Sequence, residues 1–264
     1  MAKIGLNNLW YAKLTEALDG TPSYDGAKSF GKAITANASI SNNSATLYAD
    51  DALAESDTSF QSGSLSLTTD DDRDTVFADL LGHAIDASGN IIRNVNDVAP
   101  YVAIARIIVK LVNNVKLYKV ELLYKVKFSE PSQEDNTRGE SVEFSTPTIE
   151  GQISALANGK WSEAQTFATK AEALAFIMGK LAVSGTTFRV NYDVNGGTGS
   201  ISTAVVNAGS STTINSGSTI TAPTNKEFAG WALTSSATEA EYEGGETFYP
   251  ASDVTLYAVY TAST

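Results

Sequence analysis

The sequence predicts a mainly β protein with one or two helices, built as an antiparallel β-sandwich or barrel followed by a small β-rich C-terminal domain. Residues 115–128 alternate between apolar and polar with the period of a half-buried strand, and a two-residue turn signal stands before them. Only two segments of the chain show helical spacing. The 264 residues are 42% hydrophobic, enough to bury one large core or two modest ones.

The clearest strands lie on either side of Asn113 and Asn114. Residues 101–112 are β-branched and apolar apart from Arg106 and Lys110, and the two asparagines tolerate the left-handed conformation that a two-residue hairpin requires. We therefore expect residues 101–112 and 115–128 to pair as a hairpin. The alternation in the second strand predicts one buried face and one wet, basic face.

Other strands are shorter or less regular. They are expected at residues 32–40, 45–48, 60–68 and 140–156, where Pro147 would mark an edge or a bulge. Residues 85–92 have the pattern of another hairpin. Between these strands, acidic residues open the run 70–82, apolar residues line one side of it, and Gly82 stands where a C-terminal cap belongs, so a helix is expected there.

A second helix is expected at residues 169–181, where Thr169 and Glu172 are spaced as a capping box. The chain becomes richer in Gly, Ser and Thr after about residue 183. We therefore predict a larger first domain over residues 1–183, a linker at 183–186, and a β-rich appended domain over 186–264. The order β–β–β–α–β–β–β–α in the first domain favours a sandwich or barrel flanked by a helix.

Composition excludes several functional classes. A net charge of −12 argues against a surface that grips nucleic-acid phosphates, because that affinity comes mainly from Lys and Arg. The chain has no cysteine, which excludes disulfides, thiolate catalysis and Cys-ligated metals. No apolar run approaches a membrane span, and no signal peptide follows Met1, so we expect synthesis in a cytosol and no membrane partner.

The sequence offers few candidate catalytic groups, and we predict no enzyme activity, cofactor or metal. The single histidine, His83, follows the helix-capping Gly82 and is interpreted as a cap or surface residue. The acids at residues 70–74 lack the pattern of a calcium loop and suit the start of a helix. The glycines of residues 193–199 lack the lysine of a phosphate-binding loop and are interpreted as a hairpin turn.

Three lysines, Lys119, Lys125 and Lys127, lie on the expected wet face of residues 115–128. They could meet nucleic acid. Glu121 interrupts them and the domain is acidic, so pairing with carboxylates of neighbouring strands or neighbouring subunits is the favoured interpretation.

Several runs of the first domain together resemble the major tail protein, or tail-tube protein, of bacteriophages with long non-contractile tails. The resemblance spans most of residues 1–180 and is carried by residues 4–14, 39–60, 93–101 and 124–142. It implies a virion protein, assembled in the host cytoplasm, that polymerises as stacked, hexameric rings around a channel for the viral DNA. It also implies contacts with other tail proteins: the tape measure, the tail terminator and the distal tail protein.

A ring subunit needs extensions that reach its neighbours, and residues 41–59 and 129–139 are the two long polar segments available. The acidic composition fits a channel that must release DNA. The candidate inter-subunit residues come from these two segments and from the lysine-bearing strand: Asn43, Leu47, Tyr48, Asp50, Asp51, Glu55, Lys119, Lys125, Lys127, Glu130, Gln133, Glu134 and Arg138.

Residues 187–260 separately resemble an internalin-type B-repeat, a small β-rich module of bacterial surface proteins that also occurs as an appendage on phage proteins. The resemblance is carried by residues 188–199, the run Phe228–Trp231, residues 242–247 and residues 254–260, where Tyr260 replaces the usual tryptophan. The expected core residues are Tyr192, Phe228, Trp231 and Tyr257. The appended domain would project outward and could contact a host surface.

The alternative from another class is a surface adhesin or carbohydrate-binding module. The B-repeat resemblance and the aromatic residues Trp161, Tyr242 and Tyr249, expected to be exposed, favour it. The missing signal peptide and wall anchor count against it.

Overall fold

The computed structural model describes residues 2–49, 52–70, 74–132 and 146–263. The chain divides into two compact units, Met1–Ala168 and Thr169–Thr264, and each is described by itself. The division groups helix α2 (Lys170–Leu181) with the second unit, whereas the sequence predicted that this helix closes the first domain. Gly179 of this helix approaches Gly209 so closely that a Cβ on Gly179 would lie 2.7 Å from the Gly209 Cα.

The first unit is built on one nine-stranded sheet in which all neighbours are antiparallel. The strand order is β2-β1-β10-β11-β12-β7-β4, with β3 also paired to β1 and β13 to β11. The strands are β1 (Ala2–Glu16), β2 (Pro22–Tyr24), β3 (Lys28–Gly31), β4 (Ala33–Asn42), β7 (Phe60–Thr69), β10 (Tyr101–Val112), β11 (Val115–Phe128), β12 (Thr148–Ile153) and β13 (Ser162–Phe167).

The sheet rolls into a half-barrel because one stretch of chain changes partner. β3 pairs with β1, and after Lys32 the chain continues as β4, which pairs with β7 at the other end of the strand order. The barrel is therefore drawn together where β3 meets Leu9–Tyr11 and is open beyond that point, where β1 and β4 separate. The mainly β, antiparallel fold class expected from the sequence is confirmed.

The main core fills this half-barrel, and helix α1 (Asp74–Leu81) contributes Val76, Leu80 and Leu81 to it. Gly82 follows the helix with φ +80°, and the amides of Gly82 and His83 both donate to the Ala78 carbonyl. The predicted helix and its glycine cap are confirmed. The remaining buried residues of this core come from the sheet: Leu9, Tyr11, Phe30, Leu65, Leu67, Val102, Ile104, Leu123, Val126, Phe128, Ile149 and Ile153.

The β10–β11 hairpin forms as predicted, with Asn113 and Asn114 at φ 48° and 64°. The prediction of one wet face along β11 is wrong, because Val120, Leu122 and Leu123 are all at most 3% exposed. The reason is a register shift in the β10–β11 pair, which falls between Val102 and Ile104 of β10. It reverses the alternation, so Leu123 joins the barrel core while Val120 and Leu122 point to the other face, which is also covered.

Most other predicted strands are present. Residues 32–40, 45–48 and 60–68 correspond to β4, β5 (Ala45–Ala49) and β7, and the hairpin at 85–92 is formed by β8 (Ala84–Ile85) and β9 (Ile91–Ile92). The strand expected at 140–156 is β12, which begins just after Pro147; residues 140–145 lie outside the described residues. β1, β2, β3, β6 (Ala52–Asp57) and β13 were not predicted.

The second unit opens with α2, whose predicted capping box between Thr169 and Glu172 is present. A four-stranded sheet follows, in the order β15-β14-β19-β17, and its central pair β14–β19 is parallel. Its strands are β14 (Thr187–Asp193), β15 (Ala204–Asn207), β17 (Lys226–Ala232) and β19 (Val254–Ala262). The strands β16 (Thr212–Thr213) and β18 (Thr247–Phe248) form a separate two-stranded antiparallel pair in the same unit.

Trp231 is the centre of the second core. It is fully buried, its Nε1 donates to the Asn215 carbonyl at 2.7 Å, and the rings of Tyr192 and Phe228 meet it edge-on at 4.9 and 5.2 Å. Tyr257 is half-buried, since the alternation of β19 turns its neighbours Leu256 and Ala258 into the core instead.

Tyr260, which stands where the B-repeat usually has tryptophan, closes one end of this core. Its ring packs edge-on against Phe228 at 6.3 Å, and its hydroxyl donates to the Val194 carbonyl at 2.6 Å. The hydroxyl also lies where a side chain on Gly197 would have to go. The tyrosine therefore fixes the turn that follows β14.

Candidate inter-subunit surface

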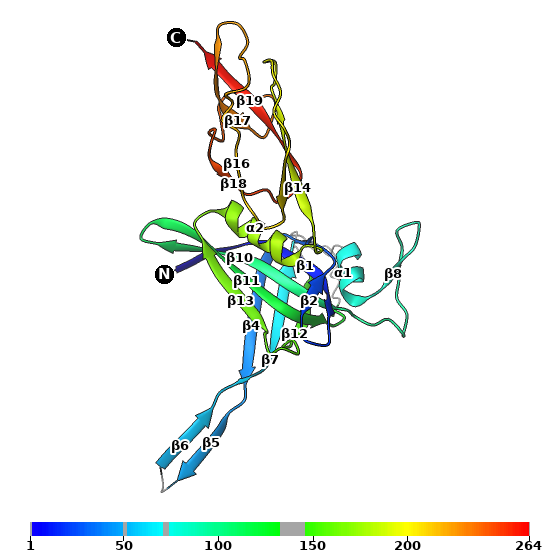
Figure 1. Ribbon diagram of the computed structural model, residues 1–264. Helices are drawn as coiled ribbons and strands as arrows, with labels where there is room; N and C mark the ends of the chain where they lie inside the picture. The colour runs from blue at the N-terminus through cyan, green and yellow to red at the C-terminus, as the bar shows by residue number, and fades with distance from the viewer. Residues whose placement is uncertain (1, 50–51, 71–73, 133–145, 264) are drawn as a thin grey trace, which may run out of the picture. The chain divides into compact units, whose positions relative to one another are not determined.

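The most prominent feature of the first unit is a two-stranded arm. β12 accompanies β7 only as far as Gly63, opposite Ile153, whereas β4 and β7 continue to pair beyond it up to Asn42 and Phe60. The Asn43 amide then donates to the Ser59 carbonyl at 2.8 Å, and β5 and β6 carry on the pairing to Ala49 and Ala52. Figure 1 shows this arm leaving the sheet as a ribbon.

At about 3.3 Å per residue, the run from Ser41 to Ala49 extends about 30 Å. Among the described strands, β5 and β6 pair only with each other. An isolated two-stranded ribbon is marginally stable in water, so an arm of this length is expected to gain its stability from a further surface.

An aromatic stack anchors the root of the arm. Phe60 lies against Trp161, with ring centroids 4.7 Å apart and planes within 5° of each other, and both rings pack on the main core. Trp161 was expected to be exposed, and this expectation is wrong. The backbone carbonyl of Trp161 accepts from the Tyr124 amide, which places the ring over β7.

The predicted residues on the two polar segments are placed as follows. Asn43 is exposed at the root of the arm, and Leu47, Tyr48 and Glu55 lie in β5 and β6, whose backbone alone is described. Glu130 is exposed just after β11. The remaining predicted residues of the two segments lie outside the described residues: Asp50, Asp51, Gln133, Glu134 and Arg138.

His83 is not the surface residue that the sequence indicated. Its side chain is only 6% exposed and lies between two carboxylates, with Nδ1 2.7 Å from Asp97 and Nε2 2.6 Å from Glu130. Hydrogen bonds from the Asn94 amide and from His83 hold the pKa of Asp97 below its usual value. The histidine thus joins the end of α1, the loop before β10 and the start of the 129–139 segment. These three segments are distant in the sequence, so no local pattern could indicate the cluster.

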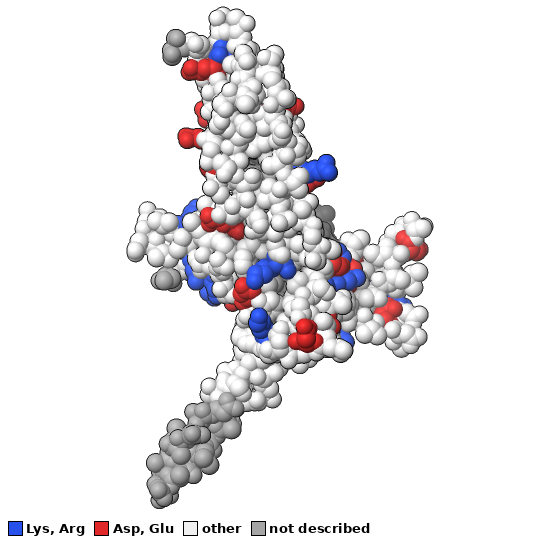
Figure 2. All heavy atoms as spheres, in the orientation of Figure 1, with Lys and Arg blue, Asp and Glu red and all other residues white. Residues whose placement is uncertain are grey.

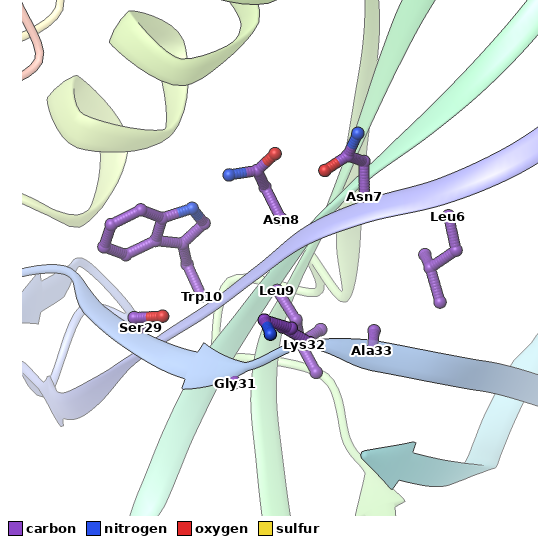
Figure 3. A pocket seen from close by; sticks show the side chains of 9 residues that line it. All are labelled: Leu6, Asn7, Asn8, Leu9, Trp10, Ser29, Gly31, Lys32 and Ala33. Carbon is purple, nitrogen blue, oxygen red and sulfur yellow. The ribbon is translucent and has the colours of Figure 1, made fainter. Parts of the chain in front are cut away.

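A second feature lies where β1 and β4 separate. A hollow of about 340 Å³ lies there. The residues that line it are drawn in Figure 3: Leu6, Asn7, Asn8, Leu9, Trp10, Ser29, Gly31, Lys32 and Ala33. Asn8 has φ 48° at a register shift of β1. Asn8 Oδ1 and Trp10 Nε1 are buried and find no hydrogen-bond partner within the described part of the chain.

The strand that borders this hollow, β4, has no charged residue, and Ile34 and Ile40 are 48% and 37% exposed. Edge strands of monomeric proteins are usually protected from further pairing by charges, proline or bulges. An uncharged, largely exposed edge strand is typical of a surface that is covered in an assembly.

The three predicted lysines do not form one basic face. Lys119 lies 3.4 Å from Glu121, and Lys125 lies 2.6 Å from Glu16, so these two pair with carboxylates of the same chain. Lys127 faces an aromatic ring, with its Nζ 5.4 Å from the Tyr101 ring centroid. The register shift in the β10–β11 pair puts Lys119 and Lys127 on opposite faces of the sheet.

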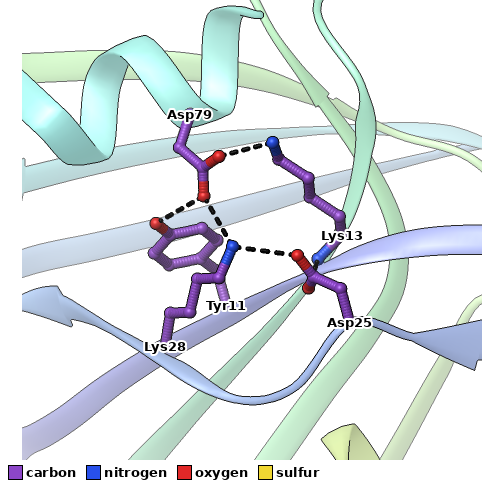
Figure 4. Close-up of polar contacts among 5 residues, drawn as sticks. All are labelled: Tyr11, Lys13, Asp25, Lys28 and Asp79. Carbon is purple, nitrogen blue, oxygen red and sulfur yellow. Dashed lines mark hydrogen bonds and ion pairs between the residues drawn. The ribbon is translucent and has the colours of Figure 1, made fainter. Parts of the chain in front are cut away.

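A polar cluster fastens α1 to the sheet. Tyr11 Oη and Lys28 Nζ each lie 3.0 Å from Asp79, Lys13 also contacts this carboxylate, and Lys28 reaches Asp25 at 2.9 Å (Figure 4). Burial alone would raise the pKa of Asp79, but hydrogen bonds from Lys13, Lys28 and Tyr11 hold it below its usual value. Two cations balance two carboxylates, so the cluster is a structural tie with no free acid or base.

The described residues contain no group of three or more His, Asp or Glu side chains placed to hold a metal ion. No helix within the described ranges is long and apolar enough to cross a membrane.

Comparison with known proteins finds a similarity within the second unit. Residues 188–259 match the family model of the Listeria-Bacteroides repeat domain, which spans β14 to β19. This match supports the B-repeat resemblance stated from the sequence. No curated protein matches the chain.

Proposed function

We propose that this chain is the major tail protein of a bacteriophage with a long non-contractile tail. In this proposal it polymerises as stacked hexameric rings into the tail tube, and the viral DNA passes through the lumen without specific binding. The tape measure, tail terminator and distal tail proteins would be its other partners, in a virion assembled in the host cytoplasm.

The arm is the observation that carries the proposal. Past the Gly63–Ile153 pair, the arm leaves the sheet as a ribbon about 30 Å long. Among the described strands, the two strands at its end, β5 and β6, pair only with each other. A subunit of a polymer can use such an extension to reach another subunit, and an isolated ribbon gains stability when a further surface covers it. The uncharged, exposed edge strand β4 supports the same conclusion.

Charge is consistent with a conduit. The chain carries 30 acidic and 18 basic residues, and Figure 2 shows acidic and basic side chains scattered over the visible face rather than gathered in a broad basic track. A wall of mixed or negative sign does not hold phosphates and lets a duplex slide. The repeat domain at residues 188–259 would be an outward appendage of the tube.

Electron microscopy of the purified full-length chain tests the proposal. Negatively stained samples at high protein concentration and moderate salt should contain rings or tubes. Light scattering on the same samples should show species far larger than 27.8 kDa. Monomers alone, under all conditions and in virion-derived samples as well, would refute it.

The match to a bacterial repeat family supports one alternative, a surface adhesin or carbohydrate-binding module. Carbohydrate sites commonly use exposed aromatic rings. Tyr242 and Tyr249 are half-buried, however, and Tyr242 packs edge-on against Phe248 at 5.3 Å. These two rings are therefore less accessible to a carbohydrate than the sequence indicated.

A further inference from the structure

The single histidine of the chain contacts two carboxylates that come from distant segments. Nδ1 of His83 lies 2.7 Å from Asp97 Oδ2, and Nε2 lies 2.6 Å from Glu130 Oε1. The side chain is only 6% exposed. Nε2 is buried, and no group in the described part of the chain is aligned to form a hydrogen bond with it. The contact with Glu130 is therefore held by charge, which requires a proton on both ring nitrogens.

One proton decides whether the charges of this cluster are balanced. A neutral imidazole has one N–H group and one bare nitrogen, so only one of the two carboxylates can then face a donor. The other would face a nitrogen lone pair, which is repulsive. Among the described residues, no lysine or arginine forms an ion pair with Asp97 or Glu130. On α1 itself, Asp79 is already engaged by Lys13 and Lys28.

Asp97 is fixed in place without the histidine. Its Oδ2 accepts a hydrogen bond from the Asn94 amide at 2.8 Å, and its own amide donates to the Asn94 carbonyl at 3.0 Å. Gly82 lies so close to the Val98 carbonyl that no side chain would fit, and this fastens the end of α1 to the same loop. Because Asp97 stays opposite Nδ1, a neutral ring would keep its proton on Nδ1 and turn a bare Nε2 towards Glu130.

Glu130 has no such support from its neighbours. The Ser129 amide donates to the Glu150 carbonyl at 3.0 Å, just beyond the end of β11. Pro131 has no amide proton to donate. Within the described ranges, the contact with His83 is the one polar contact of residues 130–132. The Glu130 side chain is 57% exposed, so it can turn into water when the contact is lost.

We propose that His83 is a proton-operated latch for the chain that leaves β11. With both ring nitrogens protonated, Glu130 is held and residues 129–132 are fixed to the end of α1. Loss of the Nε2 proton releases Glu130, while Asp97 remains bound to Nδ1. Histidine is the side chain whose charge ordinarily changes between about pH 5 and 8, and a single proton makes the release a one-step transition. The latch operates within one subunit and does not depend on the proposed tube.

A spin label placed close to Glu130 tests the latch in the full-length chain. The chain has no cysteine, so Ser132→Cys, at an exposed position, can be labelled with a nitroxide at one place only. Electron paramagnetic resonance spectra recorded from about pH 5 to pH 9 should lose their slow-motion component as the pH rises.

The proton itself can be followed on the same chain. Because His83 is the single histidine, histidine-selective 15N labelling gives one pair of ring signals in nuclear magnetic resonance spectra. The loss of the ring proton and the gain in label mobility should share one midpoint. At high pH, Nδ1 should be the protonated nitrogen and Nε2 the bare one.

Glu130→Gln is the matched variant. It keeps the shape of the side chain, and its amide group can accept from a protonated Nε2 or donate to a bare one, so the contact no longer depends on the proton. The spectrum of the Ser132 label should then be the same at both ends of the pH range. A label on Ser88→Cys, in the exposed turn between β8 and β9, controls for general effects of pH and should not change its mobility.

A pH-dependent gain in mobility at position 132, absent from Glu130→Gln and from the label at position 88, supports the latch. Three results overturn it. The ring may lose its proton while the label at position 132 does not respond, the ring may keep one charge over the whole range, or Glu130→Gln may respond to pH as the wild type does. A neutral ring that carries its proton on Nε2 also overturns it, because Glu130 would then keep its donor.

Discussion

Replacing Trp231 should unfold the second unit while leaving the first intact. The indole is fully buried and has edge contacts with two aromatic rings, so Trp231→Ala is expected to cost about 3–5 kcal/mol in the free energy of unfolding. The Asn215 carbonyl also loses its indole donor, which adds to the loss. A unit of this size is stable by only about 5–15 kcal/mol, so the combined loss removes a large part of its stability.

Urea unfolding measures this effect with an internal control. The chain has three tryptophans, and the two that remain, Trp10 and Trp161, both belong to the first unit. Their fluorescence should keep its wild-type midpoint in Trp231→Ala, while far-ultraviolet circular dichroism shows an earlier loss of strand signal.

Trp231→Phe separates the two contributions, because it keeps most of the buried area and loses the hydrogen bond. Its cost should be smaller than that of the alanine variant. A fluorescence midpoint that falls with Trp231→Ala would show that the two units unfold together. An unchanged dichroism midpoint would show that Trp231 is not central to its core. Either result refutes the reasoning.

Three further outcomes are expected. Deleting residues 129–139 should leave a folded chain by circular dichroism but impair assembly in light scattering, since polar surface segments tolerate shortening; assembly at the wild-type rate would remove this segment from the interface. Truncation after Val183 should give tubes of normal bore and smaller outer diameter in micrographs, and tubes of unchanged diameter would contradict the outward placement of the repeat domain. Asp79→Asn should lower the thermal midpoint at pH 7. Because the folded pKa of Asp79 is lowered, its contribution is present above the unfolded value near 3.8 and disappears as pH falls through the folded value, so wild type and variant should converge in acid. A difference that persists well below pH 3 would contradict the ion-pair explanation.

The features that the sequence predicted correctly depend on local signals. The Asn113–Asn114 turn, the capping box of Thr169 and the glycine cap at Gly82 each depend on a few adjacent residues, and all three are present. β1 was missed because the left-handed Asn8 and the register shifts beside it break the alternation along the strand.

The candidate surface was predicted only in outline. The polar segment 41–59 was expected to extend from the domain, but its strand pairing as an arm depends on where β12 stops beside β7. The lysines were assigned to one face because the register shift opposite Val102 and Ile104 leaves no mark in the sequence. The environment of His83 depends on Asp97 and Glu130, which only the fold brings together.

The continuity of the arm with β4 and β7 has a mechanical consequence. A pull on the arm acts along these two strands, whereas the hydrogen bonds that hold them run across the strands. The load is therefore borne in shear by many hydrogen bonds at once, instead of peeling them apart one after another. A fibre joined through such arms would resist stretching through the ladders of each subunit, and its tensile strength would come from the same strands that roll the sheet into a barrel.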